Sequence, residues 1–117
     1  MKNFMAVYTG TPDGMEKWNK LDEATRKSKE QQGMKAWGDW METHKAIIVF
    51  GGGPLGKTKR ITSQGVADTR NNLAGYIVIK AESQDAAARL FVNHPHFAIF
   101  PGDGVEVMEC LPIPGQA

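Results

Sequence analysis

The sequence has little that would indicate an extracellular, membrane-bound or nucleic-acid-binding protein. It contains one cysteine, Cys110, which cannot form an internal disulfide, so a reducing, cytoplasmic location is expected. No apolar run approaches the roughly 18 residues of a membrane span. The formal net charge is +1, and the strongly basic face that nucleic acids need is missing. We therefore expect a soluble protein with neither membrane nor nucleic acid as a partner.

The residues that are present have an ordinary globular composition. The apolar share is 41% and the charged share is 23%, which argues against disorder. A chain of 117 residues has the usual size of one domain and is long enough to bury one core. We therefore expect a single α+β domain over residues 1–117.

Apolar runs and their spacing predict the order of the elements. Four strands are expected, at Phe4–Tyr8, Ala46–Phe50, Tyr76–Ile79 and Gly104–Leu111. Between the first two, apolar residues three or four apart predict two helices, or one helix bent at Gly33. A further helix begins after Ser83 and ends before Pro95. A small hairpin insertion is expected from Lys57–Thr62 and Val66–Ala67.

Two strand–helix–strand units in this order predict a ferredoxin-like fold, in which helices cover one face of an antiparallel four-stranded sheet. The predicted strands are apolar on both sides, so the second sheet face would also be apolar. An apolar face of that size is unfavourable in water. A second copy packed sheet to sheet is the simplest cover, and we expect a homodimer.

Residues 51–58, Gly-Gly-Gly-Pro-Leu-Gly-Lys-Thr, match the phosphate-loop pattern at every fixed position. A phosphate loop also needs a helix that starts at the Lys-Thr pair, because the amides at the helix N-terminus hold the phosphates. Residues 59–65 have no apolar stripe, and no predicted strand ends in an aspartate that could bind magnesium. We interpret the stretch as a glycine-rich strand end and turn, and expect no nucleotide cofactor.

His94 and His96, with Pro95 between them, are the densest group of candidate catalytic residues. Two histidines between a helix and an aromatic stretch can act as acid and base near neutral pH. Two structural roles stay open: His94 can interact with the last carbonyls of its helix, and His96 can pack in a loop. A metal pair is less favoured, because Pro95 disturbs the geometry and no third ligand is near. No metal is expected.

Trp37 and Trp40, with Met34 and Met41, recur at helical spacing. Such a group is typical of a core, but if it lines a cavity, the cavity suits a flat apolar or aromatic molecule. Tyr8, at the end of the first strand, is a further candidate for this pocket.

Glu106 and Glu109 fall on opposite faces of the last predicted strand. With both sheet faces apolar, at least one of these carboxylates should be partly buried or lie near the dimer seam. Such a group is a candidate for proton transfer. We favour Glu106.

Several short segments in order also carry a family resemblance. They are residues 34–41, 53–55, 75–76, 94–97 and 105–107. Taken together they resemble the YCII-related family, in particular its branch with glycine-rich and DGPF-type members. The resemblance covers nearly the whole chain and implies the fold of dimeric α/β barrels, with two sheets packed against each other.

The resemblance also implies a chemistry, because some members are similar to lactone isomerases and dehydrochlorinases of small, often aromatic-derived substrates. A histidine and an aspartate are the proposed active pair in those members. This sequence departs from them: it has Trp37 in place of the helical histidine, and His94-Pro95-His96-Phe97 in place of Asp-Pro-Phe. The pair therefore does not transfer to this chain residue by residue.

Two functional hypotheses follow from the sequence. The first is a lyase- or isomerase-type enzyme that transfers protons through His94 or His96 in an apolar pocket shaped by Trp37 and Trp40. The second is a non-catalytic dimer that binds a small ligand or regulates another process. The first predicts a histidine in the cavity wall, and the second predicts an apolar pocket without converging titratable groups.

Overall fold

The computed structural model describes residues 1–115. Its elements, in chain order, are β1 (Lys2–Gly10), α1 (Pro12–Asn19), α2 (Glu23–Thr43), the 3-10 helix η1 (Lys45–Ile47), β2 (Ile48–Pro54), β3 (Thr58–Thr62), β4 (Gly65–Thr69), β5 (Leu73–Ala81), α3 (Gln84–Arg89), α4 (Pro95–Ala98) and β6 (Gly102–Glu109). No helix within these residues is long and apolar enough to cross a membrane.

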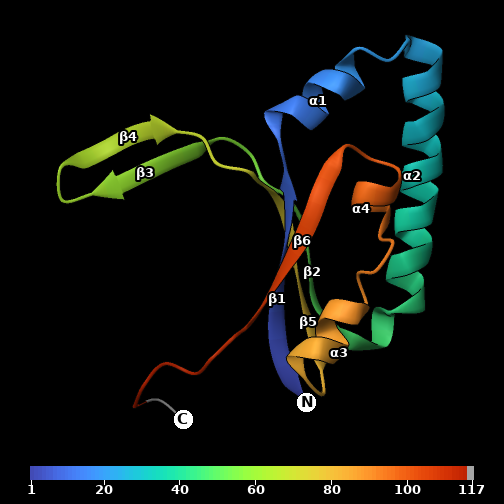
Figure 1. The fold of residues 1–117 in the computed structure, drawn as a ribbon. Helices are drawn as coiled ribbons and strands as arrows, with labels where there is room; N and C mark the ends of the chain where they lie inside the picture. The colour runs from blue at the N-terminus through green and yellow to red at the C-terminus, as the bar shows by residue number, and fades with distance from the viewer. Residues whose placement is uncertain (116–117) are drawn as a thin grey trace.

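The main sheet has four strands in the order β2-β5-β1-β6, and every neighbouring pair is antiparallel. This is the ferredoxin-like topology that the sequence predicts, and the prediction is confirmed. Figure 1 shows α2, α3 and α4 on one side of the sheet. The predicted hairpin is also present as β3 and β4, and it reaches away on the other side (Figure 1).

The core lies between the sheet and the helices. Alternate residues of β1 face it, each opposite a residue of β5: Phe4 with Ile79, Ala6 with Ile77, and Tyr8 with Gly75. Phe91, after α3, is also buried and belongs to the same cluster. Alternation along β1 therefore directs Tyr8 toward the helices, and this places it in the candidate site.

Two α-helices lie between β1 and β2, as one of the two alternatives predicts, but the boundary expected at Gly33 is wrong. The helices separate at residues 20–22, where the Asp22 side chain accepts a hydrogen bond of 3.0 Å from the Thr25 N–H and caps α2. From there α2 runs unbroken through Gly33, which is buried. A Cβ at Gly33 would lie 2.5 Å from Cε2 of Phe100. The glycine therefore permits close packing between α2 and the α4–β6 connection.

The phosphate-loop-like stretch continues strand β2 as far as Pro54, and β3 begins at Thr58. No helix follows Lys57, as the sequence predicts. Gly52 has a φ of +64°, and a Cβ there would lie 1.9 Å from the Tyr76 carbonyl oxygen. The register between β2 and β5 shifts between Phe50 and Gly53. Glycine is required at this irregularity in the strand.

Among residues 1–115, no helix covers the second face of the sheet (Figure 1). The strand registers place a group of apolar side chains on this open face, namely Met5, Val7, Phe50, Tyr76, Val78 and Met108. Phe50 is 57% exposed and Met108 is 44% exposed. The rings of Phe50 and Tyr76 stack with centroids 6.0 Å apart. The predicted apolar second face is therefore present in the structure.

Candidate functional site

The chain reverses direction at Asn93 to bring both histidines toward the core. Asn93 has a φ of 58°, in the left-handed region that asparagine tolerates better than most residues. His94 then caps α4, and Pro95 occupies its first turn, where a missing N–H costs nothing. Nδ1 of His94 accepts a hydrogen bond of 3.0 Å from the His96 N–H. The cap therefore fixes one histidine relative to the other.

His94 is enclosed by aromatic rings. Its side chain is 1% exposed. The ring centroids of Trp37, Trp40, Tyr8 and Phe91 lie 4.6, 4.9, 5.2 and 5.8 Å from that of the imidazole. Nε2 of His94 is buried without a hydrogen-bond partner within the described residues. His94 thus packs inside the aromatic cluster.

The surroundings of His94 also keep its ring neutral. Burial, followed by the nearby His96 and His44, lowers the pKa of His94 to about 4. Nδ1 accepts the His96 N–H, so the proton of the neutral ring is on Nε2. His94 is therefore a neutral acceptor at pH 7 and holds the start of α4 in place.

His96 has a different environment. Its side chain is 7% exposed, and Nε2 lies 2.6 Å from the carbonyl oxygen of Thr9. A carbonyl oxygen only accepts, so Nε2 carries the proton, and in the neutral ring Nδ1 has the free lone pair. A Cβ at Gly102 would lie 2.2 Å from His96 Nε2. Glycine at position 102 therefore makes room for the ring.

Thr9 is itself held at the end of the sheet. Its hydroxyl donates a hydrogen bond of 2.6 Å to Oδ1 of Asp103, just inside β6. The carbonyl that orients His96 is thus fixed by a bond between two neighbouring strands.

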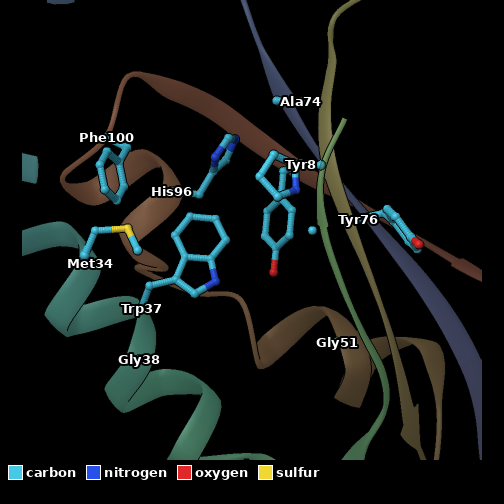
Figure 2. A pocket seen from close by; sticks show the side chains of 12 residues that line it. Tyr8, Met34, Trp37, Gly38, Gly51, Ala74, Tyr76, His96 and Phe100 are labelled. Carbon is cyan, nitrogen blue, oxygen red and sulfur yellow. The ribbon is translucent and has the colours of Figure 1, made fainter. Parts of the chain in front are cut away.

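A cavity of about 570 Å³ opens beside His96. Its wall combines aromatic side chains with glycines, notably Tyr8, Trp37, Phe100, Gly51 and Gly53. Figure 2 shows Trp37, Tyr8 and His96 grouped around this space, with Met34 and Phe100 at its border and the Tyr76 ring turned away. No charged side chain lines it among the described residues. This first cavity suits a flat, apolar or aromatic molecule.

The ring of Tyr8 packs near both histidine rings. Its ring centroid lies 5.2 Å from that of His94 and 5.1 Å from that of His96. Its hydroxyl is buried and has no partner within residues 1–115. Burial raises the pKa of Tyr8, so the phenol stays protonated at neutral pH.

The structure brings together four of the residues singled out from the sequence and separates the others. Tyr8, Met34, Trp37 and His96 line the first cavity. Trp40 lies behind it, where its Nε1–H donates a hydrogen bond of 3.0 Å to the Leu90 carbonyl. His94 is closed off within the aromatic cluster, as described above.

Glu106 does not lie with the histidines. It is opposite Val7 in the register, exposed on the open face of the sheet. The sheet therefore separates its carboxylate from His96, and the two do not form one proton-transfer site.

Sequence reasoning missed Phe100 and Gly102. Phe100 packs near Trp18 and Trp37, with ring centroids 5.9 and 6.1 Å apart. Gly102 is required by the His96 ring. The only signal was the pattern Phe-Pro-Gly-Asp-Gly at residues 100–104, which also fits an ordinary turn. Within residues 1–115, no cluster of histidine, cysteine and carboxylate side chains could hold a metal ion.

The fold and the cavity define a small α+β protein of the ferredoxin-like class, with one histidine in the wall of an apolar cavity. The chain belongs to the YCII-related domain family, which matches residues 4–112. The resemblance drawn from short segments of the sequence is therefore confirmed. No curated protein sequence matches this chain.

Among solved structures, the chain is similar to the 5-chloro-2-hydroxyhydroquinone dehydrochlorinase TftG from Burkholderia phenoliruptrix AC1100, in complex with 2,5-dihydroxybenzoquinone. The two share 16% identity at a TM-score of 0.58, over 98% of this chain and 99% of that one. At this identity the similarity shows the fold. The similarity confirms the α+β fold that the sequence predicts for one chain.

Proposed function

We propose that this protein is a lyase- or isomerase-type enzyme that removes a proton from a small planar substrate, with Nδ1 of His96 as the base. The hydrogen bond from His96 Nε2–H to the Thr9 carbonyl carries the proposal. It leaves the lone pair on Nδ1, in a ring that lines the first cavity. A base held in one tautomer beside a substrate cavity is what general base catalysis needs.

The same hydrogen bond would also assist the reaction. When Nδ1 takes a proton, the ring becomes cationic, and the bond from Nε2–H to the Thr9 oxygen strengthens. In an elimination, the electrons of the broken bond to hydrogen form a double bond as the leaving group departs. In an isomerisation, the imidazolium returns the proton to another carbon. Tyr8 and Trp37 would hold the substrate ring, and the apolar walls would strengthen these electrostatic effects.

The comparison with solved structures supports this substrate class by analogy of fold. The named activity of the dehydrochlorinase is an elimination on a chlorinated hydroxyhydroquinone, and its bound ligand is a planar dihydroxyquinone. A flat ring of that kind fits the size and the aromatic walls of the first cavity. Fold analogy is the weaker support, because function depends on the site.

The test is turnover by a variant of His96. Wild type and His96→Gln are incubated with 5-chloro-2-hydroxyhydroquinone, and chloride release is followed. We expect His96→Gln to lose at least about 100-fold in kcat/KM. His44→Gln is the matched control, because His44 does not line the first cavity. This variant should keep wild-type turnover. Unchanged turnover in His96→Gln would exclude the proposed base.

A binding protein without catalysis is the second candidate. It is favoured by one observation: within residues 1–115, His96 is the only histidine that lines the first cavity, and no carboxylate lines it. Two results together would support this alternative: tight binding of 2,5-dihydroxybenzoquinone without exchange of its ring hydrogens into D₂O, and no chloride release from 5-chloro-2-hydroxyhydroquinone.

We further propose that two copies pack through the open sheet face, in the cytoplasm, where a lone free cysteine is usual. The exposed apolar side chains of Met5, Phe50 and Met108 support the dimer, because water disfavours such a surface. Light scattering tests the dimer: the measured mass should be twice the chain mass of 12.9 kDa. Val78→Lys should return it to the mass of one chain. Val92→Lys, which changes an exposed valine after α3, should leave the dimer intact.

A further inference from the structure

A second cavity also has His96 in its wall, and it differs from the first in charge. Its volume is about 660 Å³, and it shares Ala74, His96 and Phe100 with the first cavity. Residues 70–72, between β4 and β5, add an arginine and two asparagines. No carboxylate lines it among the described residues. Arg70 therefore gives this cavity a positive charge that the first cavity lacks.

Asp68, two residues before Arg70, and Asp103, next to the lining residue Gly102, each have another partner. Asp68 forms an ion pair with Lys59 at 2.6 Å. Asp103 accepts the Thr9 hydroxyl at 2.6 Å. Arg70 forms no ion pair within residues 1–115. Its guanidinium is therefore available to a ligand.

Two hydrogen bonds hold the segment that carries Arg70, at the two residues that follow it. Oδ1 of Asn71 accepts a hydrogen bond of 2.9 Å from the Leu73 N–H, and the Asn72 carbonyl accepts one of 3.0 Å from the Gly10 N–H. Gly10 also lines the second cavity. These bonds tie the connection to the end of β1 and keep Arg70 near the wall that contains His96.

We propose that the second cavity binds an anionic group of the substrate, so that the substrate is a planar ring compound bearing a carboxylate or another acidic group. This inference rests on the proposed function. The ring occupies the first cavity, and the anionic group lies beside Arg70, with His96 in the wall common to both. A charged group would lose its hydration in the first cavity without a partner. Beside Arg70 it gains a charge-assisted, two-point hydrogen bond.

Such an anchor also serves the proton transfer. An apolar ring in an apolar cavity is free to rotate in its plane, whereas an anionic substituent fixed by Arg70 selects one orientation. A selected orientation places one ring position near Nδ1 of His96, and correct placement contributes a large part of the rate in enzymes.

The test compares two ligands that differ only in the acidic group. The binding of 2,5-dihydroxybenzoate and of 1,4-dihydroxybenzene is measured by calorimetry under anaerobic conditions. Three proteins are compared: wild type, Arg70→Gln and Arg60→Gln. Arg60 is an exposed arginine on β3 that lines neither cavity, so the control loses the same charge. Wild type should bind the benzoate at least about tenfold more tightly.

The variants then decide the proposal. Arg70→Gln should remove most of this preference and leave the affinity for 1,4-dihydroxybenzene unchanged, and Arg60→Gln should keep the preference. A preference that survives in Arg70→Gln, or no preference in wild type, overturns the anion subsite. These outcomes depend on binding alone. Failure of the subsite is therefore distinguishable from failure of His96 as the base, which appears only in the chloride-release experiment.

Discussion

His94 and His96 lie two residues apart, and the regions around them differ in nearly every physical respect. Four aromatic rings surround His94, and its Nε2 has no hydrogen-bond partner within residues 1–115. His96 lies in the wall of two cavities, and a backbone carbonyl sets its tautomer. One histidine therefore packs inside the aromatic cluster, and the other borders both cavities and is the base that we propose. Residue type alone does not distinguish such roles.

The largest expected effect is the pH dependence that the region around His94 imposes on stability. The folded pKa of His94 is about 4, below its ordinary value of 6.5. As the pH falls between these values, the unfolded chain takes up a proton that the folded chain does not. The free energy of unfolding should therefore fall by about 3 kcal/mol through this window and be fully regained above pH 6.5.

Urea unfolding between pH 4 and 7 measures this effect. His94→Asn should be less stable than wild type at every pH, because the ring packing is lost, but it should lack this part of the pH dependence. His44→Asn, which changes a half-buried histidine at the end of α2, should keep most of it. Equal slopes in wild type and His94→Asn would contradict the contrast between the two histidines.

The next largest effect concerns Gly102, where an added Cβ would meet His96 and not His94. In Gly102→Ala the new Cβ overlaps the His96 ring, so the ring must move and release the Thr9 carbonyl. We expect a loss of about 2 kcal/mol in stability. The imidazole NMR signals of His96 should shift, and those of His94 should stay.

Gly104→Ala is the matched control for this strand. A Cβ at Gly104 would lie 3.6 Å from Thr9 Oγ1, an ordinary contact distance. If Gly102→Ala proves as stable as Gly104→Ala, the close approach of His96 to the backbone is not a constraint.

The smallest expected effect concerns Tyr8, whose ring contacts both regions. Its hydroxyl is buried and has no hydrogen-bond partner in the described part of the chain, so Tyr8→Phe removes a desolvated polar group and should raise the free energy of unfolding by about 1 kcal/mol. Tyr76→Phe, on the open face, should change it by less than about 0.5 kcal/mol. A clear destabilisation in Tyr8→Phe would show that the hydroxyl has a partner in solution.

Much of the fold was predictable because it depends on local patterns. Runs of β-branched and apolar residues such as 76–79 indicate buried strands, and this run lies in β5. Ser83 is the N-cap of α3, as predicted. The break at Gly33 was wrong because a glycine weakens a helix locally, yet tertiary packing decides whether the helix continues. Here the ring of Phe100, 67 residues later in the chain, uses the space at Gly33.

The candidate site was predictable in its residue types, and less so in its geometry. The sequence identifies both histidines and the tryptophans, but not which of each faces the first cavity. Trp37 and Trp40 lie three residues apart on α2, so they share a helix face at different heights along its axis. The choice between the histidines depends on the left-handed Asn93 and on space at Gly102. These are long-range and conformational facts that spacing does not contain.

The glycine stretch of β2 determines how the volume of the first cavity can change by substitution during evolution. Gly51 and Gly53 line this cavity, and at Gly51 the absence of a side chain leaves space on the helix side of the strand. A Cβ at Gly53 would meet no atom within 4 Å, and one at Gly51 would lie 3.7 Å from Met41 Cε, whereas Gly52 between them is fixed by the Tyr76 carbonyl. A single methyl group at Gly51, on the helix side of the strand, would therefore narrow the space without moving the strand. Gly53, in contrast, is opposite Tyr76 and faces the open side of the sheet. One substitution in the segment that matches the phosphate-loop pattern can thus change the size of the molecule that the first cavity accepts.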